Sequence, residues 1–308
     1  MKLLEQMAAG LGLPKVTIQV LARKANHAYK VYTIPKRSGG SREIHHPSKE
    51  LKALQRWLLQ NVINYWPVHG AAAAYRPNLS IAHNAKRHAG SNYLLRMDLQ
   101  NFFPSITSED VKTYLTQSDF SKLEKWQSVD FDLFTALVCR NGQLTIGAPT
   151  SPALSNALCA DLDHELEAVA HARDTIYTRY ADDLFFSTVR ADVLRVFPDL
   201  VKEILKSLGC PAGLAINDSK TRHSSKKGRR QITGLVLGSD GVVGVGRKRK
   251  RYIRSLIHSF DTLAPTERQR LAGLIAFTRS VEPDFINALI IKFGSNRIVQ
   301  AQRMEYES

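Results

Sequence analysis

Cysteine is scarce in this sequence, and long apolar runs are missing from it. Only Cys139, Cys159 and Cys210 occur among the 308 residues, and no two of them are spaced as CxxC. A disulfide framework or a cysteine-rich zinc site is therefore not expected. No apolar run approaches the roughly 20 residues of a membrane-spanning helix, and residues 1–6 are too polar for a secretory signal. These absences favour a cytosolic protein with reduced thiols.

Acidic residues are few relative to basic ones. The chain holds 43 Lys and Arg against 28 Asp and Glu, which gives a formal net charge of +15. Because lysine and arginine gain free energy by displacing counterions from phosphates, a folded protein this basic usually meets a nucleic acid. A basic protein without such a partner is the alternative that charge alone leaves open.

The pattern of apolar residues predicts strands and helices that do not alternate regularly. Strands are expected at 29–35, 42–46, 93–99, 175–180, 184–188, 214–216, 231–237 and 242–245. Helices are expected after the N-cap residues Ser48 and Ser80, at 131–140, 152–172 and 193–208, and in the C-terminal region from 247 onward. Such a mixture is typical of an α+β fold.

Three aspartates stand where apolar strands end. Asp98 closes the run at 93–98, and Asp182 and Asp183 lie on a turn between two β-rich runs. Transfer of a nucleotide to a sugar hydroxyl places negative charge on several oxygens, and two Mg²⁺ ions can neutralise it. Mg²⁺ prefers oxygen ligands, so two or three carboxylates on neighbouring strands suffice. Taken alone, Asp98 also fits a helix cap, and the acidic pair also fits a solvated turn.

Four motifs, in this order, resemble those of reverse transcriptases. DLQNFFPSI at 98–106 resembles the first catalytic motif in its bacterial form, and GAPTSP at 147–152, continuing to LSN at 154–156, resembles the template-and-nucleotide motif. YADD at 180–183 resembles the YxDD catalytic box, and NDSKT at 217–221 resembles the later lysine motif. Together they cover roughly residues 28 to 255.

Two shorter strings resemble retron reverse transcriptases in particular. NAKRH at 84–88 is similar to their NAxxH element, and ITG at 232–234 is similar to their VTG element with Ile in place of Val. The resemblance implies a right-hand polymerase fold. We expect fingers and N-terminal helices at 1–92 with part of 110–145, a palm at 93–228, and the end of the palm with a helical thumb at 229–308.

The resemblance also implies partners and a product. Retron enzymes bind a structured non-coding RNA, start DNA from a 2′-hydroxyl of that RNA, and leave a branched RNA–DNA hybrid called msDNA. Many work with an effector protein in defence against phage. The region after residue 260 lacks the scattered acids of a ribonuclease H domain, so we expect a host ribonuclease H to remove RNA.

Residue roles follow from the motif matches. Asp98 and Asp182 would hold the two Mg²⁺ ions, Asp183 would assist, and Lys220 would act at the leaving pyrophosphate. Phe103 would exclude a 2′-hydroxyl and so select dNTPs; the alternative is that Phe102 and Phe103 are both core. The other nucleotide-binding candidates are Lys36 and Arg42 for the triphosphate, together with Gly147, Ala148 and Asn156.

The RNA-binding candidates lie in two groups. The retron elements supply Asn84, His88, Thr233 and Gly234, and the start of the thumb supplies Arg247, Lys248, Arg249, Lys250 and Arg251. A run of charges is more often a solvated face, and the hairpin cations and Lys220 also fit plain surface positions.

One departure from the family pattern keeps rival interpretations open. The family usually has Gln before the glycine at 147, and this chain has Ile146. An RNA-binding scaffold without synthesis is one rival, and an intron-encoded type of reverse transcriptase is another.

Overall fold

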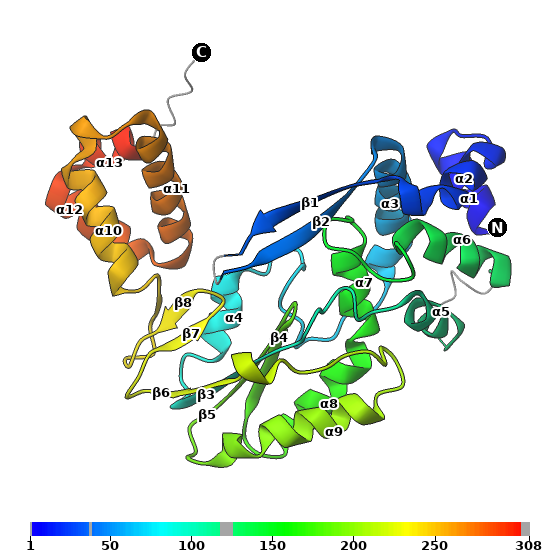
Figure 1. The fold of residues 1–308 in the computed structure, drawn as a ribbon. Coiled ribbons are helices and arrows are strands. Elements are labelled where there is room, and N and C mark those ends of the chain that lie inside the picture. Colours follow the sequence, from blue (N-terminus) through cyan, green and yellow to red (C-terminus); the bar gives the residue numbers. More distant parts are fainter. Residues whose placement is uncertain (1, 37–38, 118–125, 303–308) are drawn as a thin grey trace. The chain divides into compact units, whose positions relative to one another are not determined.

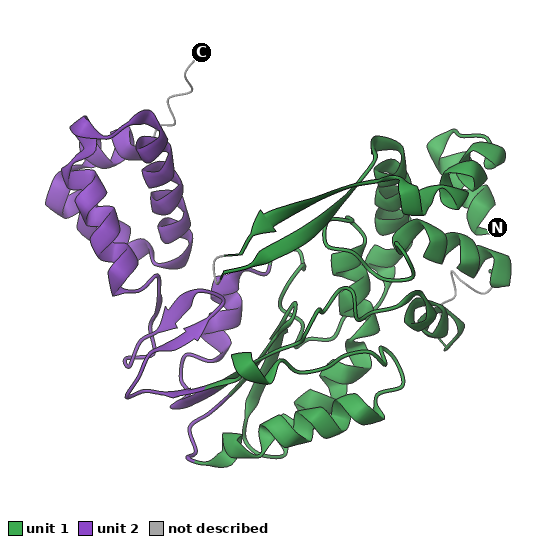
Figure 2. Ribbon diagram, viewed as in Figure 1, with its two compact units in different colours: residues 1–78, 95–186, 192–222 green, residues 79–94, 187–191, 223–308 purple. Residues whose placement is uncertain are grey.

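The computed structural model describes residues 2–36, 39–117 and 126–302. The chain divides into two compact units, and each is continuous only in space (Figure 2). Unit 1 comprises residues 1–78, 95–186 and 192–222, and unit 2 comprises residues 79–94, 187–191 and 223–308. The division into fingers, palm and thumb at 92 and 228 stays a prediction.

The N-terminal part of unit 1 is helical and carries a two-stranded ribbon. Its elements are α1 (Leu3–Leu11), α2 (Lys15–Arg23), η1 (Ala25–His27), β1 (Tyr29–Pro35), β2 (Ser41–Pro47), α3 (Lys49–Asn61) and η2 (Ile63–Tyr65). Helix α3 begins after Ser48, whose hydroxyl accepts a hydrogen bond from the Leu51 N–H at 3.3 Å. The antiparallel ribbon β1–β2 is largely exposed and places Ile34 opposite Arg42.

A four-stranded sheet carries the segments in which the three aspartates lie. Its strands are β3 (Tyr93–Asp98), β4 (Ile176–Tyr180), β5 (Asp183–Thr188) and β6 (Arg222–Ser225), in the order β4-β5-β3-β6. Unit 1 adds α5 (Ser108–Gln117), α6 (Ser128–Val138), α7 (Ser151–Leu158), α8 (Ala160–His171), η3 (Val193–Arg195), α9 (Phe197–Ser207) and η4 (Asp218–Lys220). Helix α8 packs against β4 and α9, so the strands of the acidic hairpin have a fixed support (Figure 1).

Unit 2 combines one short helix, a small sheet and the C-terminal helices. These are α4 (Ile81–Arg87), β7 (Arg230–Ile232), β8 (Leu235–Leu237), β9 (Val243–Gly244), α10 (Arg247–His258), η5 (Phe260–Thr262), α11 (Pro265–Val281), α12 (Pro283–Phe293) and α13 (Ser295–Gln302). Helix α4 contacts all three strands of the β7-β8-β9 sheet. Helices α10 to α13 enclose an apolar core that includes Ile253, Leu271 and Phe285. None of the described helices is long and apolar enough to cross a membrane.

Most of the predicted elements are present, and four differ. The predicted helix 193–208 is a 3-10 turn, η3, followed by the helix α9. The predicted helix 152–172 is two helices, α7 and α8, which meet at Cys159. The run 214–216 forms no strand, and Ile216 instead makes an isolated bridge with Leu99, the residue after β3. The run 231–237 is a hairpin, because Thr233 and Gly234 have φ of +48° and +85° and reverse the chain.

Candidate active site

A backbone hydrogen bond joins the first catalytic motif to the acidic turn within unit 1. The Leu99 N–H donates to the Asp182 carbonyl oxygen at 2.8 Å. Ala181 has a φ of +57°, the left-handed conformation that allows the chain to reverse between β4 and β5. The strand that ends at Asp98 therefore lies beside the turn that carries Asp182 and Asp183, as the sequence predicts.

Lys220 is the cation that contacts Asp98. The Asn217 N–H donates to the Asp98 carbonyl oxygen at 2.8 Å, which brings the lysine motif alongside the end of β3. From there the Lys220 Nζ donates to both carboxylate oxygens of Asp98, at 2.8 and 3.0 Å. The Asp98 side chain is 6% exposed and that of Lys220 is 54% exposed. Lys220, the lysine predicted to act at the pyrophosphate, thus forms an ion pair with Asp98, a predicted metal ligand. About half of the Lys220 side chain remains exposed to solvent.

Arg96 neutralises the second acid of the turn. Its guanidinium donates to Asp183 Oδ1 at 2.8 and 3.0 Å and to Oδ2 at 3.2 Å. Burial nevertheless raises the pKa of Asp183 to about 6, and the neighbouring Asp182 contributes to the rise. Burial first, and then the charge of Asp98, also raises the pKa of Asp182. The charge of Asp98 therefore acts on both Asp182 and Asp183, and the charge of Asp182 acts on Asp183.

The donor chemistry of these acids fits a divalent cation, although no ready-made cage is present. Within residues 2–36, 39–117 and 126–302, no group of three or more His, Cys, Asp or Glu side chains is arranged to hold a metal ion. Carboxylates whose pKa is raised by burial and by each other's charge gain from a nearby positive ion, and Mg²⁺ prefers carboxylate oxygens. In this structure Lys220 and Arg96 supply that charge. A metal at Asp98 would have to displace the lysine at least in part.

Gly147 allows the close contact between the β1–β2 ribbon and the turn before α7. The His45 N–H donates to the Ile146 carbonyl oxygen at 2.8 Å. A Cβ added at Gly147 would lie 2.6 Å from the His45 carbonyl oxygen, and the φ of Gly147 is +118°. Glycine is thus required here because the backbone of β2 approaches closely, and the predicted role of Gly147 in nucleotide binding stays a prediction.

Ala148 and Asn156 have packing roles in this structure. Ala148 is 3% exposed and Asn156 is 1% exposed, so neither side chain presents a surface to a nucleotide. The Asn156 amide donates to the Ala74 carbonyl oxygen at 2.8 Å and accepts a hydrogen bond from Arg179 at 3.3 Å. Any effect of Asn156 on the nucleotide would pass through these two neighbours.

The two phenylalanines of the first motif differ in exposure, as expected if one of them is core. Phe102 is 5% exposed and packs with the Arg179 guanidinium 5.9 Å from its ring centroid. Phe103 is only partly buried, and its ring lies 6.4 Å from that of Tyr75. Phe103 is therefore the ring that remains accessible to a ligand.

The hairpin cations are exposed. Arg42 lies on β2, and its charge reaches Asp182, where it lowers the carboxyl pKa against the opposing effect of burial. Lys36 ends the described part of the first arm, and its N–H donates to the Gly40 carbonyl oxygen at 3.0 Å. Arg37 lies outside the described residues. Arg42 is thus close enough to Asp182 to act on its carboxyl pKa, and its binding to the triphosphate stays a prediction.

Comparison with known proteins gives this geometry a family. Residues 34–238 match the reverse transcriptase (RNA-dependent DNA polymerase) family. The Retron Ec83 reverse transcriptase of Escherichia coli is 37% identical over 292 residues, 92% of this chain and 93% of that protein. The Retron Ec86 reverse transcriptase of Escherichia coli is 32% identical over 308 residues, 97% of this chain and 93% of that protein.

The chain belongs to the retron reverse transcriptases. The assignment drawn from NAKRH and ITG is thereby confirmed. Among solved structures, telomerase from Candida albicans in complex with a fragment of telomeric RNA aligns with a TM-score of 0.50 and 14% identity, over 91% of this chain and 61% of that one. At this identity the likeness shows the fold alone, and it agrees with the expected α+β polymerase fold.

In unit 2 of this reverse transcriptase, the NAxxH residues are buried. Asn84 is 1% exposed and His88 is fully buried. The His88 Nδ1 lies 2.7 Å from the Ser187 hydroxyl oxygen, which in turn lies 2.8 Å from that of Ser91. Burial lowers the pKa of His88 to about 3, so the ring is neutral at physiological pH. In this structure, the buried side chains of Asn84 and His88 are not available to contact RNA.

Thr233 and Gly234 form the turn of the β7–β8 hairpin. Ile232 pairs with Leu235, so the loop contains only these two residues. Both have positive φ, as in the type I′ turns that suit right-twisted hairpins. Thr233 is partly exposed and Gly234 is exposed. The ITG element is therefore explained by turn chemistry, and its contact with RNA stays a prediction.

The basic run at the start of α10 is divided between two faces. Arg247, Lys248 and Arg251 are exposed. Arg249 instead lies over the Phe277 ring at 5.0 Å, and Lys250 makes an ion pair with Glu282. Only the exposed set within this run is free to meet phosphates directly.

Sequence reasoning did not single out the buried ion pair beneath the acidic turn. Arg179 and Asp163 are both 0% exposed, and their bidentate contact has distances of 2.6 and 2.8 Å. The Tyr177 hydroxyl also donates to Asp163 at 2.8 Å, and Arg179 reaches the Ala181 carbonyl at 3.4 Å. An arginine inside an apolar strand signals a hidden acid, but the sequence does not say which one.

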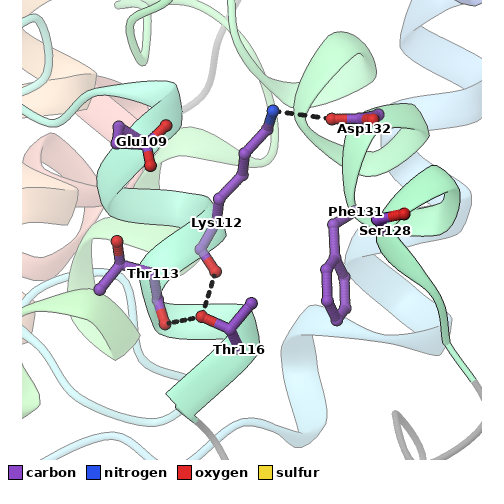
Figure 3. Close-up of a pocket in the computed structure, with 7 residues that line it drawn as sticks. All are labelled: Glu109, Lys112, Thr113, Thr116, Ser128, Phe131 and Asp132. Carbon is purple, nitrogen blue, oxygen red and sulfur yellow. Dashed lines mark hydrogen bonds and ion pairs between the residues drawn. The ribbon is translucent and has the colours of Figure 1, made fainter.

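A pocket of about 270 Å³ is lined by residues of α5 and α6. Figure 3 shows two of them, Lys112 and Asp132, joined by an ion pair of 2.7 Å. Its lining holds none of the residues that the motifs point to. The catalytic assignment therefore rests on the acids and not on this cavity.

Proposed function

We propose that this enzyme copies a structured non-coding RNA into single-stranded msDNA, starts from a 2′-hydroxyl of that RNA, and depends on two Mg²⁺ ions. The observation that carries the proposal is the Leu99–Asp182 hydrogen bond of 2.8 Å, which sets Asp98 beside the acidic pair. Dependence on divalent cations agrees with the raised pKa of Asp182 and Asp183. The relatives support the retron assignment, and the RNA class and the product are proposed from it.

The reaction is nucleotidyl transfer. The primer hydroxyl oxygen attacks the α-phosphorus of a dNTP, a new P–O bond forms, and the bond from that phosphorus to the bridging oxygen breaks. Pyrophosphate leaves with the electron pair, and the hydroxyl proton passes to solvent. Bound divalent ions would lower the charge on the attacking and leaving oxygens. Asp98 and Asp182 would hold them, and Asp183, already tied to Arg96, would fix the local charge.

We propose that the Lys220 side chain acts in two positions, one at Asp98 and one at the leaving pyrophosphate. Its Nζ holds the Asp98 carboxylate in this structure, and its half-exposed side chain can turn to a leaving pyrophosphate once a metal takes its place. There the ammonium would neutralise or protonate the leaving group. Lys220 would therefore pair with Asp98 until substrate and metal arrive.

The partners are proposed from the retron class. Exposed Arg247, Lys248 and Arg251 on α10 would bind phosphates of the RNA or of the hybrid. Removal of template RNA would fall to a host ribonuclease H. An effector protein would complete a system that acts against phage.

Primer extension tests the polymerase assignment. We expect dNTP incorporation on an RNA template with Mg²⁺, and at least a thousandfold loss in Asp182→Asn, because the change removes a carboxylate and keeps the shape. Asp192→Asn is the matched control: Asp192 is an exposed acid with φ of +63°, a conformation that asparagine tolerates. RNA binding without extension by the wild type would instead establish an RNA-binding scaffold.

Sequencing of copurified nucleic acid tests the retron details. A short, hairpin-rich RNA joined through a 2′–5′ linkage to DNA, and separable by a debranching enzyme, is expected. Intron RNA or an unbranched DNA would contradict the 2′-hydroxyl start and leave the polymerase assignment standing.

A further inference from the structure

Tyr75 is an exposed aromatic residue in an unusual backbone conformation. Its side chain is 48% exposed and its φ is +60°. Bulky residues seldom occupy this left-handed region, and those that do are concentrated at functional sites where the surroundings hold them. No motif in the sequence draws attention to this residue.

The chain before Tyr75 is firmly held within unit 1. The Arg179 N–H donates to the Ala71 carbonyl at 2.9 Å, and the Ala73 N–H donates to the Arg179 carbonyl at 2.7 Å. The Asn156 amide holds the Ala74 carbonyl at 2.8 Å. The segment before Tyr75 is therefore held by hydrogen bonds to β4 and α7. The ring of Tyr75 is exposed even though its backbone follows a fixed segment.

The ring of Tyr75 packs beside Phe103, a predicted part of the nucleotide site. Its ring lies 6.4 Å from Phe103 with an interplanar angle of 42°. Partial desolvation raises the pKa of its hydroxyl, the charge of Asp182 raises it further, and the charge of Arg42 opposes the rise. Tyr75 thus packs beside the ring that would touch the sugar, and the charges of Asp182 and Arg42 act on its hydroxyl.

We propose that Tyr75 forms the second aromatic wall of the nucleotide site, so that selection of deoxyribose belongs to the Tyr75–Phe103 pair rather than to Phe103 alone. This inference rests on the proposed polymerase function. A rigid ring beside Phe103 limits how far Phe103 can tilt away from an added 2′-hydroxyl. Loss of that support would admit ribonucleotides more than it would slow the use of dNTPs.

Single-nucleotide insertion on an RNA template measures this directly. The readout is kcat/KM for dCTP divided by kcat/KM for CTP, in the wild type, Tyr75→Asn, Tyr75→Phe, Phe103→Ala and the Tyr75→Asn/Phe103→Ala double variant. Asparagine is chosen because it tolerates the left-handed backbone while it removes the ring. Tyr65→Ala, at another exposed tyrosine, is the matched control.

The expected result is a fall of about tenfold or more in discrimination for Tyr75→Asn, a value near wild type for Tyr75→Phe, and a double variant that falls by less than the product of the single effects. Discrimination within twofold of wild type in Tyr75→Asn would overturn the inference while wild-type extension upheld the polymerase. Multiplicative effects would also overturn it, because independent residues do not share one gate. Absence of extension by the wild type would overturn the proposed function and this inference together.

Discussion

Two of the ion pairs in unit 1, that of Asp163 with Arg179 and that of Asp98 with Lys220, differ in access to solvent. Asp163 and Arg179 are both fully buried, whereas Lys220 keeps 54% of its side chain exposed while it holds Asp98. The arginine pair is bidentate and planar, and the lysine pair is a point charge on a flexible stem. Another cation cannot readily replace Arg179 beside Asp163, because both side chains are buried. Another cation can replace Lys220 beside Asp98, because half of the lysine side chain is in solvent.

This difference in solvent access indicates that the Asp163–Arg179 pair has a structural role and that the Asp98–Lys220 pair is available for chemistry. A buried pair gains little net free energy over apolar residues of the same size, so its retention favours a geometric role. Arg179 here touches the Ala181 carbonyl, Asn156 and the Phe102 ring. The fixed pair thus holds the turn in shape, and the exchangeable pair leaves Asp98 open to another cation.

The largest effect is expected from breaking the fixed pair. Asp163→Asn leaves the Arg179 guanidinium buried without its counter-charge and should cost about 3–5 kcal/mol of unfolding free energy. Urea denaturation measures it.

The double variant Asp163→Leu/Arg179→Met is the control. It removes both charges, so most of the stability should return while extension activity stays low, because the Ala181 and Asn156 contacts are gone. A loss below about 1 kcal/mol in Asp163→Asn would contradict the account of this pair.

A neutral buried group in unit 2 sharpens the comparison through pH. The pKa of His88 falls to about 3 in the folded protein because of burial. Below its unfolded value the unfolded chain binds a proton that the folded chain does not, so stability falls as pH falls from about 6.5 toward 3. Between pH 6.5 and 5 this amounts to about 2 kcal/mol. Thermal or urea unfolding of wild type and His88→Gln across this range should show a shallower slope in the variant, and equal slopes would show that His88 is not held neutral.

The smallest effect on stability is expected at the exchangeable pair. Lys220→Met should change the unfolding free energy by less than about 1 kcal/mol, because the lysine is half exposed. The half-saturating Mg²⁺ concentration should fall, since the competing cation is gone, and kcat should fall tenfold or more if Lys220 serves the leaving group. Lys202→Met, at an exposed pair with Asp218, should change neither. A higher Mg²⁺ requirement in Lys220→Met would contradict the competition.

Local signals in the sequence predicted the parts of the fold that carry the acids. The apolar run before Asp98 and the two runs around YADD form β3, β4 and β5, because strand periodicity and turn residues are local properties. The cap at Ser48 was likewise predictable from one side chain and its spacing.

Features that depend on distant contacts were not predictable. The break between α7 and α8 falls at Cys159, a fully buried residue, and neither glycine nor proline marks it in the sequence, so its cause lies in packing. The partner of Arg179 is one of many acids in the sequence, and only the fold selects Asp163. Burial of Asn156 and His88 likewise follows from tertiary contacts and not from their motifs.

Iron-mediated cleavage tests most directly whether one cation site is built from Asp98 and the acidic turn. Fe²⁺ replaces Mg²⁺, ascorbate and peroxide generate hydroxyl radicals at the bound ion, and the protein fragments are mapped. We expect cuts near residue 98 and near residues 182–183, both suppressed by excess Mg²⁺ and both lost in Asp182→Asn. Cuts at only one of the two segments, or cuts that survive in Asp182→Asn, would contradict a shared site.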